Sequence, residues 1–156
     1  MKRFKGLLFV LFAFIALISL TGCGNKTAIT AEDFKTKMEG KGYSVTDATS
    51  QFSEVDYIEK AYVALSSDQS YQIEFYQISD NDKAAGFYNN NKQIFEESKG
   101  NTNVESSVSI GNHSKYTLET DGMYKIVSRI DNTVVYLNVE SENKSDVQDI
   151  LKELDY

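Results

Sequence analysis

The chain has one cysteine, one histidine, no proline and no tryptophan among its 156 residues. One cysteine excludes a disulfide framework within the chain, and with one histidine it cannot supply the usual zinc ligand sets. Basic residues are also scarce, with 16 against 23 acidic ones and a net charge of −7. Nucleic-acid binding needs clustered Lys and Arg, so we exclude that class of partner. Stability must therefore come from an apolar core.

Long apolar runs are confined to the start of the chain. Lys2, Arg3 and Lys5 precede an apolar run over residues 7–20, which ends at Leu20-Thr21-Gly22-Cys23. A membrane-spanning helix needs about 20 apolar residues, and this run is shorter. A charged start, a short apolar segment and small residues at its end are typical of a secretory signal. An ordinary signal peptide fits the length and leaves the position of the cysteine unexplained.

The sequence Leu20-Thr21-Gly22-Cys23 resembles the lipobox of bacterial lipoproteins. The resemblance implies that residues 1–22 are a removed signal peptide and that Cys23 becomes the diacylglyceryl-modified first residue. Residues 23–29 are then the acylated cysteine and a short tether, and two acyl chains hold a protein to a bilayer stably. The Lys, Asn and Ile content favours a Gram-positive source, which places the chain on the outer face of the plasma membrane. An outer-membrane location is the alternative.

Removal of the signal changes the charge of the protein. Losing Lys2, Arg3 and Lys5 from 16 basic residues leaves 13 against 23 acidic ones, a net charge of −10. An acidic surface keeps a secreted domain soluble, and we do not expect such a surface to lie flat on an anionic leaflet.

Residues 30–156 are expected to form a single α+β domain. Periodicity predicts a helix that begins at Thr30, two strands over 57–65 and 71–76, and a second helix between Ser79 and Gly100. Strands over 115–119, 123–130 and 133–139 follow, with turns at Asp121-Gly122 and Asp131-Asn132, and a terminal helix begins near Ser145. Residues 43–48 and 104–110 have weaker strand patterns. We therefore predict an antiparallel sheet of about five strands with the helices packed on one face.

Two segments of the chain look alike. Residues 75–81 and 137–143 each lead from a strand into a helix. A duplicated strand-strand-helix unit would explain the likeness, and so would independent use of the same strand-to-helix chemistry.

Catalytic and metal-binding patterns are weak. His113 and the adjacent Ser114 are the basis of a hydrolase alternative, but no nucleophile elbow accompanies them, and we interpret His113 as a solvated loop residue. Asp80-Asn81-Asp82 resembles the start of a calcium loop, yet the later ligands and the glycine are missing, so these acids are interpreted as helix-start residues. We predict a non-enzymatic protein with no cofactor, no metal and no catalytic residue.

Tyrosine is the one compositional excess, with ten residues. If helices cover one face of the sheet, strand tyrosines on the other face would form an aromatic patch for a glycan, a small molecule or a protein. The candidate surface comprises Tyr62, Tyr76, Tyr124, Tyr136 and, beside a turn, Arg129. Tyrosine is also a good strand residue, so a purely structural role is the alternative.

The whole chain resembles the small lipoproteins of Gram-positive gut bacteria. Beyond the lipobox, the similar segments are residues 30–34, 128–136 and 152–156. Resemblance to that family implies a membrane location and a topology, and it implies no established activity. We expect a lipid-anchored extracytoplasmic binding or interaction module, with a structural or regulatory subunit of a membrane sensor or transporter as the alternative.

Overall fold

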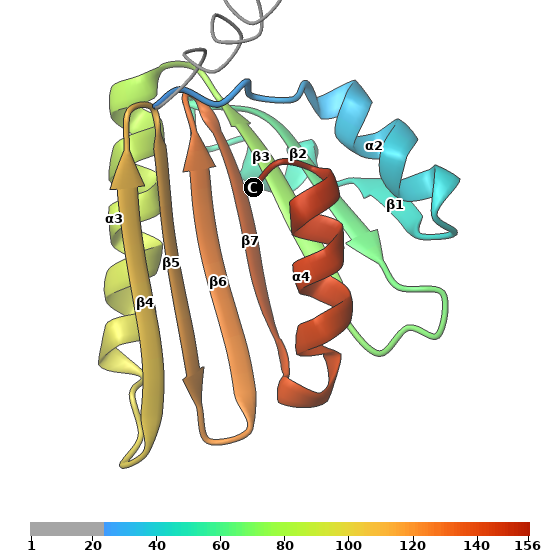
Figure 1. Ribbon diagram of the computed structural model, residues 1–156. Coiled ribbons are helices and arrows are strands. Elements are labelled where there is room, and N and C mark those ends of the chain that lie inside the picture. Colours follow the sequence, from blue (N-terminus) through green and yellow to red (C-terminus); the bar gives the residue numbers. More distant parts are fainter. Residues whose placement is uncertain (1–23) are drawn as a thin grey trace, which may run out of the picture.

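The computed structural model describes residues 24–156 and contains one antiparallel sheet of seven strands (Figure 1). The strand order across the sheet is β1-β2-β3-β7-β6-β5-β4. The strands are β1 (Ser44–Asp47), β2 (Ile58–Leu65), β3 (Gln72–Ile78), β4 (Asn103–Ile110), β5 (His113–Thr120), β6 (Met123–Ile130) and β7 (Thr133–Glu140). The predicted mixed α and β composition and antiparallel sheet are confirmed. The sheet is larger than predicted, because the weakly patterned segments form β1 and β4.

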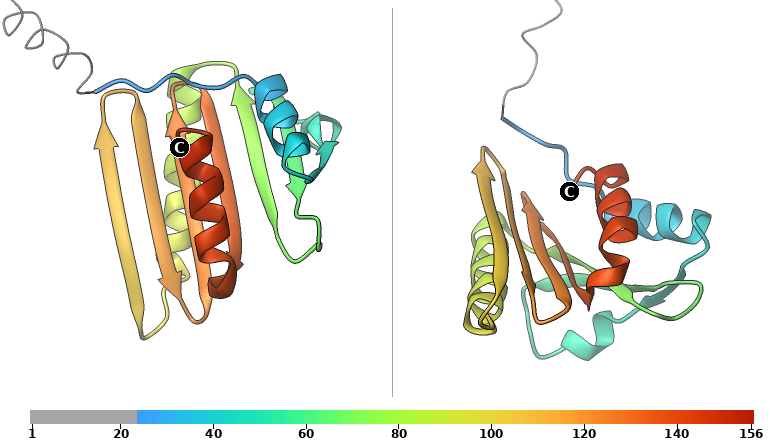
Figure 2. Two further views of the ribbon diagram at one scale, coloured as in Figure 1. Left: turned by 45° about the vertical axis from the view of Figure 1, so that its right-hand side comes forward. Right: turned by 60° about the horizontal axis from the view of Figure 1, so that its bottom comes forward.

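Helices cover both faces of the sheet, so the expectation of helices on one face is wrong. Helices α2 (Ala31–Gly40) and α4 (Lys144–Glu153) pack on one face, and α3 (Asn81–Glu97) packs on the other with the short helix η1 (Thr49–Phe52). Figure 2 shows α3 and α4 on opposite sides of the strands. The sheet is therefore the middle layer of three.

The central strands have the composition that burial on two sides requires. β7 contains the nearly unbroken apolar run Val134 to Leu137, which is typical of a strand covered on both faces. Val135 and Leu137 pack under α2 and α4, whereas Val134 packs under α3. A run of this kind, rather than strict alternation, is the signal that the one-face expectation overlooked.

Local signals for the starts of α2 and α3 and for two tight turns are confirmed, whereas α4 has no side-chain cap. Thr30 caps α2, its Oγ1 accepting a hydrogen bond from the Asp33 amide at 3.1 Å. Asp80 caps α3 by accepting from the Lys83 amide at 2.8 Å, as expected of a helix-start acid. That hydrogen bond lowers the pKa of Asp80. Asp121 and Asp131 have positive φ values of 50° and 49° at the two tight turns of the β5–β6 and β6–β7 hairpins.

The two like segments diverge after their strands. β2–β3 and β6–β7 are hairpins whose last strands, β3 and β7, are neighbours in the sheet. If the two hairpins were copies of one duplicated unit, a two-fold axis perpendicular to the sheet would relate them, and the helices that follow them would lie on the same face. In the structure α3 and α4 lie on opposite faces. The likeness therefore covers the hairpins and stops at the helices.

Candidate binding cleft and basic pocket

The structure does not bring the four candidate tyrosines together on one exposed face. Tyr62 pairs with Phe75 across β2 and β3, whereas Tyr76 pairs with Ala61, so the two rings point to opposite faces. Tyr62 and Tyr124 lie in the core under α2 and α4, and Tyr76 and Tyr136 lie on the α3 side.

Three of these tyrosines are buried and hydrogen-bonded. Tyr62 donates to Glu32 Oε1 at 2.6 Å, and this hydrogen bond together with burial raises the pKa of Tyr62 to about 12. The Tyr124 hydroxyl accepts from Gln148 Nε2 at 2.9 Å. Tyr76, which is 7% exposed, donates to Glu74 Oε2 at 2.5 Å. Each ring fills the core while its hydroxyl reaches a polar partner at the edge.

Strands β3 and β7 separate at one end and leave a cleft beside the fourth tyrosine. Their pairing runs from Gln77 with Thr133 to Glu74 with Tyr136 and continues no further, although β7 extends to Glu140. The opening has a volume of about 520 Å³. This β3–β7 cleft is lined by Leu65, Gln69, Ser70, Tyr71, Gln72, Glu74, Met123, Tyr136, Asn138, Val139 and Glu140.

Glu74 is held in place at the closed end of the β3–β7 cleft. Its Oε1 accepts from Gln72 Nε2 at 2.8 Å, and its Oε2 accepts from the Tyr76 hydroxyl. Burial and the charge of Glu74 raise the pKa of the half-buried Tyr136, whose ring stacks on Phe95 at 5.1 Å between ring centroids. The cleft thus presents a fixed carboxylate beside a fixed aromatic ring.

Arg129 lies away from the cleft and has a local structural contact. Its Nη1 donates to the main-chain oxygen of Asp131 at 3.0 Å, within the β6–β7 turn. Its Nε is buried and has no hydrogen-bond partner among residues 24–156. The structure therefore places Arg129 at the opposite end of β7 from the cleft.

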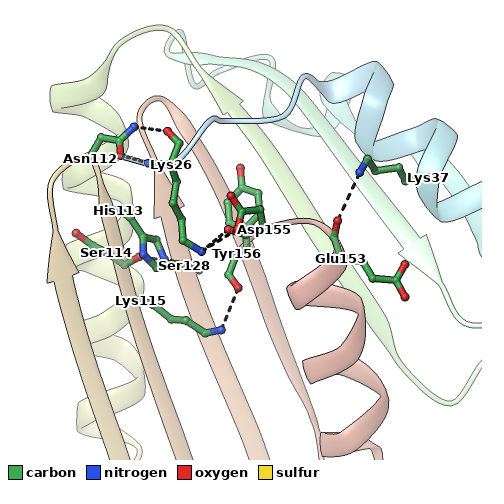
Figure 3. Close-up of polar contacts among 10 residues, drawn as sticks. All are labelled: Lys26, Lys37, Asn112, His113, Ser114, Lys115, Ser128, Glu153, Asp155 and Tyr156. Carbon is green, nitrogen blue, oxygen red and sulfur yellow. Dashed lines mark hydrogen bonds and ion pairs between the residues drawn. The ribbon is translucent and has the colours of Figure 1, made fainter. Parts of the chain in front are cut away.

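Residues 24–29, which we call the strap, are docked against that opposite end. The Lys26 amide donates to Asn112 Oδ1 at 2.9 Å, and Asn112 Nδ2 donates back to the Lys26 carbonyl at 2.8 Å (Figure 3). Ala28 and Ile29 pack against the core under α2 and α4. A Cβ at Gly111 would overlap the main-chain carbonyl of Gly24, and Gly111 has a φ of 57°. The expected tether is thus fixed to the β4–β5 turn.

Beneath the strap lies a cavity of about 310 Å³, which we call the basic pocket. It is lined by Lys26, Lys115, Gln148, Lys152, Asp155 and Tyr156. Lys26 Nζ donates to the main-chain oxygen of Asp155 at 2.5 Å and lies 3.4 Å from its carboxylate, and Lys115 Nζ donates to the main-chain oxygen of Tyr156 at 3.2 Å (Figure 3).

His113 is buried next to the basic pocket, so its interpretation as a solvated loop residue is wrong. It begins β5, is 8% exposed, and its Nε2 lies 3.2 Å from the Ser128 hydroxyl. Burial and the charges of Lys26 and Lys115 lower its pKa. The neighbouring Ser114 points to the other face, where its hydroxyl contacts Ser109. The His113–Ser114 pair of the hydrolase alternative is therefore not assembled.

Metal-ligand clusters and membrane-spanning helices are both absent from the described part of the chain. Residues 24–156 contain no group of three or more His, Cys, Asp or Glu residues arranged to hold a metal ion. No helix in this range is long and apolar enough to cross a membrane. Cys23, the predicted lipidation site, lies outside the described residues and directly precedes Gly24.

Tyr136 is a candidate residue that lines the β3–β7 cleft, but neither the cleft nor the basic pocket was predicted from the sequence. Neither the end of β3–β7 pairing nor the docking of the strap has a local sequence signal, although the Gly111-Asn112 pair is typical of a tight turn. Comparisons with protein-family models, curated proteins and solved structures found no match to this chain.

Proposed function

We propose that this protein is a lipid-anchored, non-catalytic binding module on the outer face of a bacterial plasma membrane. The observation that supports this proposal is that the strap and the β3–β7 cleft lie at opposite ends of the strands. The strap contacts the β4–β5 turn, near the end of β6, whereas the cleft is lined by Met123 at the start of β6.

Acylation of Cys23 at the strap end would present the cleft away from the bilayer. Gly24 is covalently next to Cys23, and consecutive Cα atoms are about 3.8 Å apart. The docked strap holds Gly24, the neighbour of the acylated residue, at the β4–β5 turn. The strands then run away from the membrane, and the cleft faces the space from which a ligand arrives.

The lining of the cleft favours a small ligand that carries a cationic amine. Glu74 and Glu140 contribute two carboxylates, and no lysine or arginine lines the cleft. The half-buried ring of Tyr136 offers an apolar surface with a polar tip, which suits both sugars and cations. An amino sugar combines both properties, so glucosamine is the natural first probe.

Glucosamine is expected to bind the acylated protein, residues 23–156, in detergent micelles more tightly than N-acetylglucosamine, and glucuronate is expected not to bind. Glu74→Gln should weaken glucosamine binding by about tenfold or more, because a hydrogen bond to a charged group contributes roughly 1.5–3 kcal/mol. NMR titration gives the dissociation constants.

The matched control for this titration is Glu54→Gln, which removes the same charge at an exposed site outside the cleft. It should bind glucosamine as the unchanged protein does. Equal affinity for the three sugars, or equal loss in both variants, would contradict an amine-binding cleft.

The edge strand β4 favours a second candidate function, that of a subunit of a membrane complex. All eight of its residues are exposed, and Val104, Val108 and Ile110 point to one face of this unpaired edge. An uncovered edge of this kind can pair with a strand of another protein. Photo-crosslinking from Ser106 in native membranes distinguishes the two functions, since a subunit would crosslink to one constant protein without added ligand.

A further inference from the structure

The basic pocket concentrates positive charge in an acidic protein. Three lysines line it, and Asp155 is the one acidic side chain among the lining residues. The Asp155 carboxylate is 64% exposed and pairs with Lys26. Neither Lys115 nor Lys152 forms an ion pair with any residue in the range 24–156. Among the described residues, these two lysines therefore have no acidic side chain as a partner, and Lys115 donates only to a main-chain oxygen of Tyr156.

The geometry points to a phosphate-binding site in the basic pocket, filled by the headgroup of an anionic phospholipid in the leaflet that holds the anchor. This inference rests on the lipid anchor of the proposed function. Lysines bind phosphate as point charges, and three of them converge here from the strap, β5 and α4. Free phosphate has the same chemistry and is the other source to be tested.

The burial of Lys115 favours the binding of an anion in the basic pocket. Lys115 is half-buried on β5 and reaches the main-chain oxygen of Tyr156. Burial and the neighbouring charge of Lys26 lower the pKa of Lys115. Holding these two cations close together therefore costs free energy. The polar group behind them, His113, adds no negative charge. A bound anion would relieve this repulsion.

The position of the pocket favours a lipid as the source of the phosphate. Lys26 follows Cys23 by three residues, a span of at most about 11 Å for an extended chain. The strap itself forms one wall of the pocket. Headgroups that surround the acylated Cys23 are therefore within reach of Lys26 and of the lysines behind it.

The test is the melting temperature of the acylated protein, residues 23–156, in three settings. The first two are vesicles of phosphatidylcholine alone and vesicles that also contain phosphatidylglycerol. The third is detergent micelles with inorganic phosphate, for which the control is sodium chloride at the same ionic strength. Phosphatidylglycerol is expected to raise the melting temperature by roughly 5 °C at tenfold saturation. Lys115→Gln and Lys152→Gln, measured separately, should each reduce that rise, whereas Lys60→Gln at an exposed pair on β2 should not.

Each outcome of this test decides the inference. A rise with phosphatidylglycerol alone identifies the lipid source, and a rise with inorganic phosphate as well identifies free phosphate as a ligand of the same site. No rise in either setting, or an undiminished rise in both lysine variants, would overturn the inference. Lys152 is exposed, so its variant is expected to fold even if the Lys115 variant does not. Failure of the protein to float with phosphatidylcholine vesicles would instead contradict the anchor, while the inorganic phosphate arm still tests the pocket.

Discussion

Replacing Cys23 by serine is expected to abolish incorporation of labelled fatty acid into the protein completely. A diacylglyceryl anchor is attached through a thioether, and Cys23 is the only thiol in the chain. Each buried CH₂ contributes about 0.8 kcal/mol to membrane binding, so loss of both acyl chains removes the dominant attachment of the mature protein. Metabolic labelling with palmitate in a Gram-positive host, followed by intact mass measurement, checks this result.

The control for the Cys23 experiment is Thr21→Ser, which keeps a small residue in the lipobox-like segment. It should be labelled and processed like the unchanged chain, with a mass that matches residues 23–156 plus the lipid. Label that persists in the Cys23→Ser variant, or a chain of unchanged sequence that takes up none, would contradict the lipoprotein assignment.

Replacing Phe34 by alanine is expected to lower the free energy of unfolding by about 3–5 kcal/mol. Phe34 is fully buried on α2 and stacks on Phe75 of β3, with ring centroids 4.8 Å apart and an angle of 18° between planes. Small domains are typically stable by only about 5–15 kcal/mol, so the loss is a large fraction of the total. Urea denaturation of the full chain in detergent micelles measures the change.

Ile94→Ala on α3 is the matched comparison for Phe34, because it also truncates a large apolar side chain on a helix. Ile94 is 49% exposed, and its truncation should change stability by no more than about 0.5 kcal/mol. Similar losses for the two variants would show that α2 does not pack on the sheet through Phe34 as described.

Element positions were predictable because their signals are local. Thr30, Asp121 and Asp131 act through their own backbone neighbourhoods, and the structure confirms a helix start and two hairpin turns at these residues. The apolar period of the later strands likewise depends on residues close in sequence. Such features need no knowledge of which distant segments meet.

The placement of the tyrosines was not predictable in the same way. The exposed-patch hypothesis required one open sheet face and a register that put Tyr62 and Tyr76 on the same side. The register instead puts them on opposite faces, where α2 and α4 cover Tyr62 and α3 covers Tyr76. A shift of one residue in register moves a side chain to the opposite face, and a sequence period does not fix that register.

The cleft and the strap depend on contacts between residues far apart in the chain. The cleft exists because β3 and β7, which are not consecutive, stop pairing after Glu74 and Tyr136. The strap is docked because Asn112 presents an amide to Lys26, 86 positions earlier. His113 was misplaced for the same reason, because the partner of its ring, Ser128, lies across the β5–β6 hairpin.

In the proposed arrangement the domain stands on the bilayer by its strap end, with the cleft directed away. The most direct measurement is quenching of a fluorophore by nitroxide lipid headgroups in phosphatidylcholine vesicles that carry the acylated protein. Labels are placed at Asp82→Cys, on the exposed first turn of α3 at the strap end, and at Ser67→Cys in the exposed β2–β3 turn. Acylated Cys23 leaves the introduced thiol as the single labelling site.

This orientation predicts strong quenching at position 82 and weak quenching at position 67, because the eight residues of β5 span about 27 Å between the two ends. Equal quenching at the two positions, or stronger quenching at 67, would contradict it.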